Sequence, residues 1–319
     1  MHRRDFVLTG TVATGLAVLA TAPAAAATTP TLRGPYVDLT TGKGNMLTLA
    51  RMNSNFDETK VKYGSASGRV FGVRPGEAIR DLFGAEVVST ARAWKQPDGS
   101  YRVLHRETVL YTDLTSGDVL GEFKNPYTKE TVKVVDVVND PWNETFEEFE
   151  RAPPSYGGLN KMADPERKPV VLPWRDVGAG LIAATRHVNL YYPSALQPDK
   201  WPRESSGKFN QVTEVFAYIV PLKDVQDEKK TSLTYTGTWS RSTPWLPWML
   251  MGQAPGHCWY ETTMQGFDTL EGFKPKILAY MQKTHPEMLV PPPKESWAKP
   301  NLSSLEVYAR DQKPAPLKP

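Results

Sequence analysis

The alternation of apolar and polar residues predicts a protein built mainly from β-strands. The clearest alternating run covers residues 101–111, and turn signals such as Pro97-Asp98-Gly99 separate it from its neighbours. Further strands are expected at 86–94, 119–123, 131–138, 180–192, 211–220, 232–241 and 258–266. Closely spaced turns favour antiparallel pairing, and residues 86–138 are expected to form an antiparallel meander. We therefore predict a mainly β fold, with an antiparallel sheet that is curled or closed into a barrel of lipocalin-like size.

Helices are expected only at the periphery of this sheet, at residues 44–52 and 275–284. Asn139-Asp140-Pro141 is expected to end the strand before it, with Asn139 or Asp140 capping backbone donors. Residues 144–176 are acidic and then rich in proline, which indicates a long excursion or lid. A single β-rich domain is predicted over residues 44–297, after a linker at 28–43. A Pro- and Lys-rich tail, partly disordered, is expected at 298–319.

The first 27 residues have the pattern of a cleaved export signal. Arg3 and Arg4 precede a short apolar run, and small residues offer a cleavage site near Ala26-Ala27. The arginine pair resembles a twin-arginine leader. We therefore expect the twin-arginine export machinery to be a partner, and a periplasmic or secreted location after cleavage.

Charge and cysteine content exclude several classes of protein function. The chain has 38 basic and 35 acidic residues without a long block of either sign, a pattern that argues against nucleic-acid binding. Nothing after residue 27 has the apolar length of a membrane span, so no stable membrane insertion is expected. Cys258 is the only cysteine, which excludes an internal disulfide. Its neighbour His257 would point to the opposite face of a strand, so a Cys–His nucleophile pair is disfavoured there.

Candidate chemistry first appears on the strand predicted at residues 101–111. His105, Glu107 and Tyr111 occupy alternate positions, so they share one face of that strand. If this face looks inward, His105 and Glu107 can form an acid/base pair, because burial moves the pKa of both groups toward neutrality. Arg102 and Arg106 are then expected to face solvent. The alternatives are a satisfied polar pair, or burial of the opposite face.

A second candidate face lies on the strand predicted at residues 232–241. Tyr235, Gly237, Trp239 and Arg241 alternate along it. Gly237 leaves space beside two large rings, as a ligand or a neighbouring backbone would require. An arginine in line with aromatic rings often meets a carboxylate or a phenolate. Tyr235 and Trp239 are therefore predicted to bind a ligand.

The loop that follows is rich in tryptophan, proline and methionine. Its prolines prevent a regular strand, because each removes a ladder donor. Trp245, Trp248, Met249 and Met251 could form the lip of an apolar pocket and bind the ligand there. An equally good alternative is a loop that plugs the end of the barrel.

Cofactor and metal motifs are absent from the sequence. There is no phosphate-binding loop, no dinucleotide fingerprint and no nucleophile elbow, so no cofactor is expected. The histidines lack metal-ligand spacing, and no metal is expected either. A site assembled from distant strands, beginning with His105 and Glu107, is the alternative.

Four sequence blocks resemble one known family. They are Tyr111, Asp113 and Gly117 in a Tyr-x-Asp-x-x-Ser-Gly stretch, the turn at 125–128, Asn139-Asp140-Pro141, and the tryptophan-rich block at 244–252. Together they make the chain similar to the domain-of-unknown-function family 1838 (DUF1838), from about residue 44 to 297. The resemblance implies a single β-rich domain that is frequently exported. It brings no agreed activity and no catalytic residues.

These features support one leading hypothesis and two alternatives. The leading hypothesis is an exported β-barrel-like protein that binds a small aromatic or terpenoid-type molecule and performs cofactor-free acid/base chemistry of the lyase, isomerase or hydrolase type. His105 and Glu107 would move protons, Tyr111 would donate a hydrogen bond, and Arg241 would hold an anionic group of the ligand. The alternatives are a non-catalytic periplasmic carrier of an apolar molecule, and an exported interaction module with a filled core.

Overall fold

The structure is a computed structural model that describes residues 32–149, 167–291 and 293–317. The export signal expected at residues 1–27 lies outside these ranges. Much of the excursion expected at residues 144–176 also lies outside them. The rest of that excursion belongs to the strands and loops described below.

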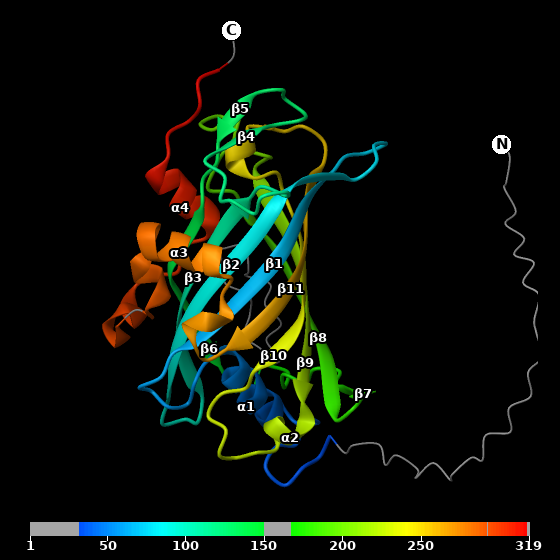
Figure 1. Cartoon of the computed structure of the whole chain (residues 1–319), viewed down its shortest axis with the longest axis vertical. Helices are drawn as coiled ribbons and strands as arrows, with labels where there is room; N and C mark the ends of the chain where they lie inside the picture. The colour runs from blue at the N-terminus through cyan, green and yellow to red at the C-terminus, as the bar shows by residue number, and fades with distance from the viewer. Residues whose placement is uncertain (1–31, 150–166, 292, 318–319) are drawn as a thin grey trace, which may run out of the picture. The chain divides into compact units, whose positions relative to one another are not determined.

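Within the described residues, nine antiparallel strands form one strongly curled half-barrel sheet (Figure 1). In spatial order the strands are β6 (Val137–Phe146), β3 (Tyr101–Thr112), β2 (Arg80–Lys95), β1 (Lys62–Val73), β11 (His257–Phe267), β10 (Tyr235–Thr243), β9 (Phe209–Pro221), β8 (Leu181–Pro193) and β7 (Arg175–Gly178). The two edge strands, β6 and β7, do not pair with each other. The prediction of a curled antiparallel sheet is therefore confirmed in its open form.

Most of the strands lie where the alternation of residues predicts them, but β1 was not expected. Its sequence contains glycines and serines, which have low strand propensity. The strand is nevertheless paired along its length with β11 on one side and β2 on the other. A Cβ atom at Gly68 would lie 2.0 Å from the Glu261 carbonyl oxygen of β11. Close approach of the neighbouring backbone thus explains a glycine in the middle of the sheet.

The predicted meander over residues 86–138 is wrong in its last two strands. β4 (Glu122–Lys124) and β5 (Thr131–Lys133) form a separate two-stranded sheet, and β6 pairs with β3. β6 continues through Asp140 and Pro141 instead of ending there. An edge strand tolerates proline because one side of its backbone has no ladder partner to lose. Asn139 and Asp140 also make side-chain contacts, with Glu107 and Arg106 respectively.

Short elements cover both ends of the curled sheet (Figure 1). α1 (Gly42–Asn53) and α2 (Leu222–Val225) lie at one end, and α1 contains the helix predicted at 44–52. The β4–β5 hairpin and the 3₁₀ turn η3 (Pro247–Met249) lie at the other end. None of the described helices combines the length and the apolar character that crossing a bilayer requires.

A second hydrophobic layer covers the outer face of β2 and β3. α3 (Pro275–Thr284) matches the predicted helix, and η4 (Leu270–Gly272), η5 (Pro286–Leu289) and η6 (Lys294–Ala298) flank it. Val88 of β2 and Leu110 of β3 pack here against Ile277 and Met281 of α3. These contacts bury the strand face that points away from the interior of the half-barrel.

This outer layer corrects the expectation that Arg102 and Arg106 face solvent. The Arg106 side chain is only 14% exposed and binds Asp140 at 3.0 Å. It also donates to the backbone carbonyls of Glu287 and Val290. Arg102 lies over the ring of Trp297. The C-terminal segment therefore provides backbone carbonyls for the guanidinium of Arg106 and an aromatic face for that of Arg102.

The segment expected to be a tail contains the helix α4 (Ser304–Asp311). A capping box begins it, in which Ser303 and Glu306 satisfy each other's backbone donors. α4 packs on β6, and its Tyr308 ring lies 5.9 Å from the ring of Trp201. The helix thus reaches from the β6 edge to the loop that follows β8.

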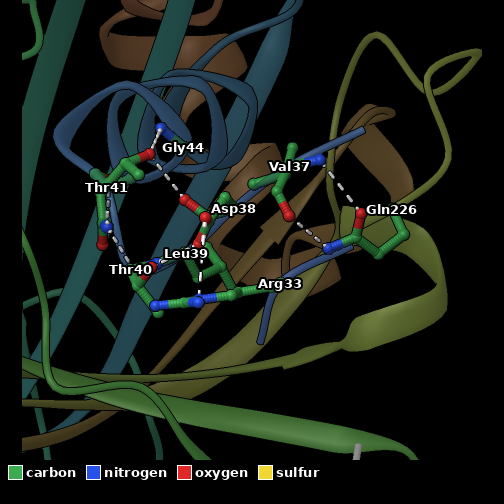
Figure 2. Close-up of polar contacts among 9 residues, drawn as sticks. Arg33, Val37, Asp38, Leu39, Thr40, Thr41, Gly44 and Gln226 are labelled. Atoms are coloured by element: carbon green, nitrogen blue, oxygen red, sulfur yellow. Dashed lines mark hydrogen bonds and ion pairs between the residues drawn. The ribbon is translucent and has the colours of Figure 1, made fainter. Parts of the chain in front are cut away.

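Hydrogen bonds hold the chain near residues 33–44 against α2 (Figure 2). Gln226 accepts from the Val37 amide at 3.1 Å and donates to the Val37 carbonyl at 2.8 Å. Thr41 caps α1 by accepting from the Gly44 amide. The buried Arg51 of α1 donates to three carbonyls between residues 225 and 230. α1 is therefore fixed across one end of the half-barrel by polar contacts.

Candidate active site

The curled sheet surrounds a cavity of about 820 Å³. Eight of the ten side chains predicted to form a site line it. They are His105, Glu107, Tyr111, Tyr235, Trp239, Arg241, Trp245 and Trp248. Strands β1, β2, β3, β6, β8, β9, β10 and β11 contribute the walls, and α4 contributes residues at the open side of the half-barrel.

Alternation along paired strands brings these residues together. On β10, Tyr235, Trp239 and Arg241 are two or four residues apart and line the cavity. Trp239 lies opposite Phe216 of β9, and Arg241 lies opposite Glu214. A Cβ atom at the intervening Gly237 would lie 1.9 Å from the Ala217 carbonyl oxygen of β9. Close approach of the neighbouring backbone, one of the two explanations offered from the sequence, accounts for this glycine.

Glu107 is a carboxyl group on the cavity wall, with polar and charged neighbours. The Asn139 amide, opposite it on β6, donates to its Oε1 at 3.0 Å. Burial raises the pKa of Glu107 above its ordinary value, and the positive charge of Arg241 only partly opposes this rise. Glu214 and Glu144 raise this pKa further. Glu107 is therefore poised to hold a proton at a higher pH than an exposed glutamate.

Arg241 forms an ion pair inside the cavity wall. Its Nη1 lies 3.3 Å from Oε1 of Glu214 on the next strand. Burial acts to lower the pKa of Arg241, but the nearby acidic groups, Glu214 first among them, together outweigh burial, so the pKa is raised and the guanidinium stays charged. The sequence predicted that Arg241 would meet a carboxylate or a phenolate, and Glu214 of the protein itself provides this carboxylate.

Two tyrosine hydroxyls meet beside this ion pair. The hydroxyl oxygens of Tyr111 and Tyr260 are 3.2 Å apart and buried. Burial raises the pKa of both phenols, so they remain protonated at neutral pH. One hydroxyl can donate to the other while the second O–H remains available as a donor. The pair is suited to stabilise a negative oxygen on a bound molecule.

His105 has partners of its own. Its Nε2 lies 3.2 Å from the Asn53 carbonyl oxygen, and its Nδ1 lies 3.8 Å from Glu144 Oε2. An irregularity in the β3–β6 pairing separates His105 from Glu107. In the part of the chain that the structure describes, no hydrogen bond joins the side chains of His105 and Glu107. Both line the same cavity, but as two separate groups.

Aromatic rings form a continuous wall next to the polar groups. Trp239 lies between Phe216, at 6.3 Å, and Tyr260, at 5.6 Å between ring centroids. Tyr218 and Tyr235 make an edge contact at 5.6 Å. Such a wall can hold a flat apolar molecule by ring contacts.

Several buried polar atoms at the cavity have no partner among the residues that the structure describes. They are Asn139 Oδ1, Arg241 Nε, Trp239 Nε1 and Trp248 Nε1. Buried polar groups of folded proteins are nearly always hydrogen-bonded. Their concentration here marks the cavity as a place where a polar molecule would be stabilised.

The tryptophan-rich loop combines both of its predicted roles. Trp245 and Trp248 line the cavity, whereas Met249 and Met251 are buried away from it. Met249 Sδ lies 3.7 Å from Cys258 Sγ. Asn125 in the β4–β5 turn donates to the Met249 carbonyl at 2.7 Å and lies 3.3 Å from Met251 Sδ. The loop is thus tied to the hairpin that covers this end.

Cys258 is unsuited to nucleophilic chemistry. Its side chain is fully buried, and burial raises the pKa of its thiol to about 12. Among the described residues, no group of three or more His, Cys, Asp or Glu side chains is placed to hold a metal ion.

Three polar residues of this site were not singled out as site residues from the sequence. Asn139 was expected to cap a strand end, and neither Glu214 nor Tyr260 was considered. Alternation offers a signal for the last two, because Glu214-x-Phe216-x-Tyr218 and Tyr260-x-Thr262-x-Met264 each place polar and aromatic residues on one face. No local signal identifies Asn139, whose role depends on its pairing with Glu107.

Comparison with known protein families gives a match over most of the chain. A family model described as a protein of unknown function (DUF1838) matches residues 60–312, most of the chain. No curated protein matches the chain. The matched range includes every cavity-lining strand residue named above.

The raised pKa of Glu107 predicts a pH-dependent stability. As pH rises above about 4, the carboxyl ionises in the unfolded chain while the folded chain keeps its proton, so folding loses stability until pH passes the raised pKa. Glu107→Gln removes this loss, so its stability relative to wild type should increase as pH rises above about 4, until pH passes the raised pKa of the folded chain. Urea unfolding across this range measures the difference. The exposed Glu122→Gln is the control, and parallel profiles for wild type and Glu107→Gln would contradict the prediction.

Proposed function

The chain belongs to the DUF1838 family, and we propose that it is an enzyme that binds a small molecule with an apolar ring system and transfers protons to and from it. One observation carries the proposal. A protonatable carboxyl, a charged guanidinium and a pair of phenols share a cavity that is also lined by aromatic rings and aliphatic side chains.

The dimensions of the cavity support binding of a small molecule. Pockets for such ligands generally have volumes of about 300–1,000 Å³ and a few polar groups on apolar walls. The cavity falls in that range at about 820 Å³. Its volume also favours ligand binding over an interaction module, which would have a filled interior.

The polar groups support a proton-transfer step. Protonated Glu107 can donate its proton to a ligand atom, and the resulting carboxylate is then stabilised by the Asn139 amide and the charge of Arg241. Tyr111 or Tyr260 can donate a hydrogen bond to an oxygen that gains negative charge. A second proton transfer from the ligand returns Glu107 to its starting state. Isomerisation, and the addition or removal of water, all fit this cycle.

The aromatic wall predicts the effect of removing one ring. Trp239→Ala should raise the Kd for the neutral dye phenylnaphthylamine about tenfold, because the dye loses a large apolar contact. Fluorescence titration of the dye measures this change. Tyr191→Ala is the matched control, because Tyr191 lies on β8 but is 58% exposed. Equal affinities of the Trp239→Ala variant and wild type would place the dye elsewhere.

The chemical step has its own test. Wild type, incubated with a small-molecule extract of the producing cells, should convert at least one compound to a product of equal mass or of a mass differing by one water. Glu107→Gln should slow this conversion about 100-fold or more while leaving dye binding intact, because the amide cannot cycle a proton. Mass spectrometry of both incubations provides the readout. If wild type converts nothing yet retains a compound through purification, a carrier function replaces the proposal.

We further propose that the twin-arginine route exports the chain to the periplasm or the medium. Replacing Arg3 and Arg4 together by lysine should leave uncleaved precursor in the cytoplasm, because this route depends on the paired arginines. Cell fractionation followed by immunoblotting measures the distribution. Unchanged export of the double variant would rule this route out.

A further inference from the structure

We propose that Arg186, together with the hydroxyls of Tyr218 and Tyr235, binds an anionic group of the ligand, so the ligand is an organic acid with an apolar ring body. This inference rests on the proposed function, because it assigns the ligand class of the same cavity. The sequence predicted that Arg241 would hold the anionic group of the ligand, and we assign this role to Arg186 instead.

Arg186 is a cation on the cavity wall that lacks a partner among the described residues. It lies on β8 opposite Phe216 of β9 and lines the cavity. Among the described residues, nothing forms a hydrogen bond or an ion pair with its guanidinium. Arg241, in contrast, is bound to Glu214 at 3.3 Å. Lys133, a second lining cation, lies on the short strand β5 and is exposed to solvent.

Two phenol hydroxyls accompany this guanidinium. Tyr218 is 5% exposed, and its edge contact with Tyr235 brings the two rings to 5.6 Å. Neither hydroxyl has a hydrogen-bond partner in the part of the chain that the structure describes. Burial raises the pKa of Tyr235 to about 12, so its hydroxyl remains a donor. Burial likewise raises the pKa of Tyr218, and the charge of Arg186 opposes that rise.

Strand register places these three groups on one diagonal of the sheet. Tyr218 pairs with Ala184 of β8, two residues before Arg186. Tyr218 also pairs with Gly237 of β10, two residues after Tyr235. Diagonal neighbours on one face lie within reach of long side chains. A guanidinium and two phenols therefore present donors to a common region of the cavity.

The carboxylates near this region have other side-chain neighbours. Glu214 is held by Arg241, and Glu144 lies 3.8 Å from His105. Glu107 has a raised pKa and accepts from Asn139. Arg186 is left to pair with an external anion. Its planar guanidinium can donate hydrogen bonds to both oxygens of a carboxylate, and a phenol hydroxyl can donate a further hydrogen bond to the same group.

Two dyes that share one ring system test the inference. Phenylnaphthylamine is neutral, and anilinonaphthalenesulfonate adds a single sulfonate to the same rings. Wild type should bind the sulfonate dye about tenfold more tightly, because Arg186 pairs with its charge. Arg186→Gln should abolish this preference and leave the affinity for the neutral dye unchanged. Fluorescence titration of both dyes provides the Kd values.

Two further variants make the test specific. Arg175→Gln removes an exposed cation from the adjacent strand β7 and should change neither affinity. Tyr218→Phe removes only a hydroxyl, so it should weaken binding of the sulfonate dye even if Arg186→Gln fails to fold. A sulfonate dye that binds no better than the neutral one, or whose affinity does not depend on Arg186 and Tyr218, overturns the inference but leaves the proposed binding function standing. Failure of wild type to bind either dye instead contradicts the proposed function.

Discussion

A sheet that curls without closing has an interior that other parts of the chain must cover. β6 and β7 are the edges of the half-barrel and do not pair, so the backbone alone cannot seal the space between them. α4 packs on β6, lines the cavity and contacts the loop after β8 through Tyr308 and Trp201. α1 and the tryptophan-rich loop cover the two ends. In a small closed barrel, the side chains of the strands fill the interior. Here the helices and the loop contact the sheet through side chains, and a cavity remains inside the half-barrel.

Several ionisable groups that line this cavity have partners on neighbouring strands, and two groups, Glu107 and Arg186, carry the functional argument. Glu214 with Arg241 and Glu144 with His105 are partners across neighbouring strands. Placing an unpaired charge in such a setting is costly, so a group without a counterion either changes its protonation or meets a ligand. Glu107 follows the first course, since its pKa is raised. Arg186 has no hydrogen-bond or ion-pair partner among the described residues, and a ligand anion is the partner that we propose for it.

Strand alternation correctly predicted which side chains face the interior, but it did not predict which side chains contact each other. The inward orientation of Glu107, Tyr111 and Arg241 follows from which residues alternate, and all three line the cavity. The predicted contact between His105 and Glu107 did not follow, because a pairing irregularity gives each side chain a different partner. The partner of Arg241 was also beyond the sequence, since Glu214 lies 27 residues away and meets it only through the register of β9 and β10.

The sequence by itself determined the secondary structure of most strands, the antiparallel class, the two helices at residues 44–52 and 275–284, and the family resemblance. These depend on local periodicity and turn chemistry, which neighbouring residues encode. Only the tertiary structure decided that β6 pairs with β3, that α4 lines the open side, and that Asn139, Glu214 and Tyr260 join the site. Such contacts join residues far apart in the chain, and their choice depends on strand order and register, which local patterns do not specify.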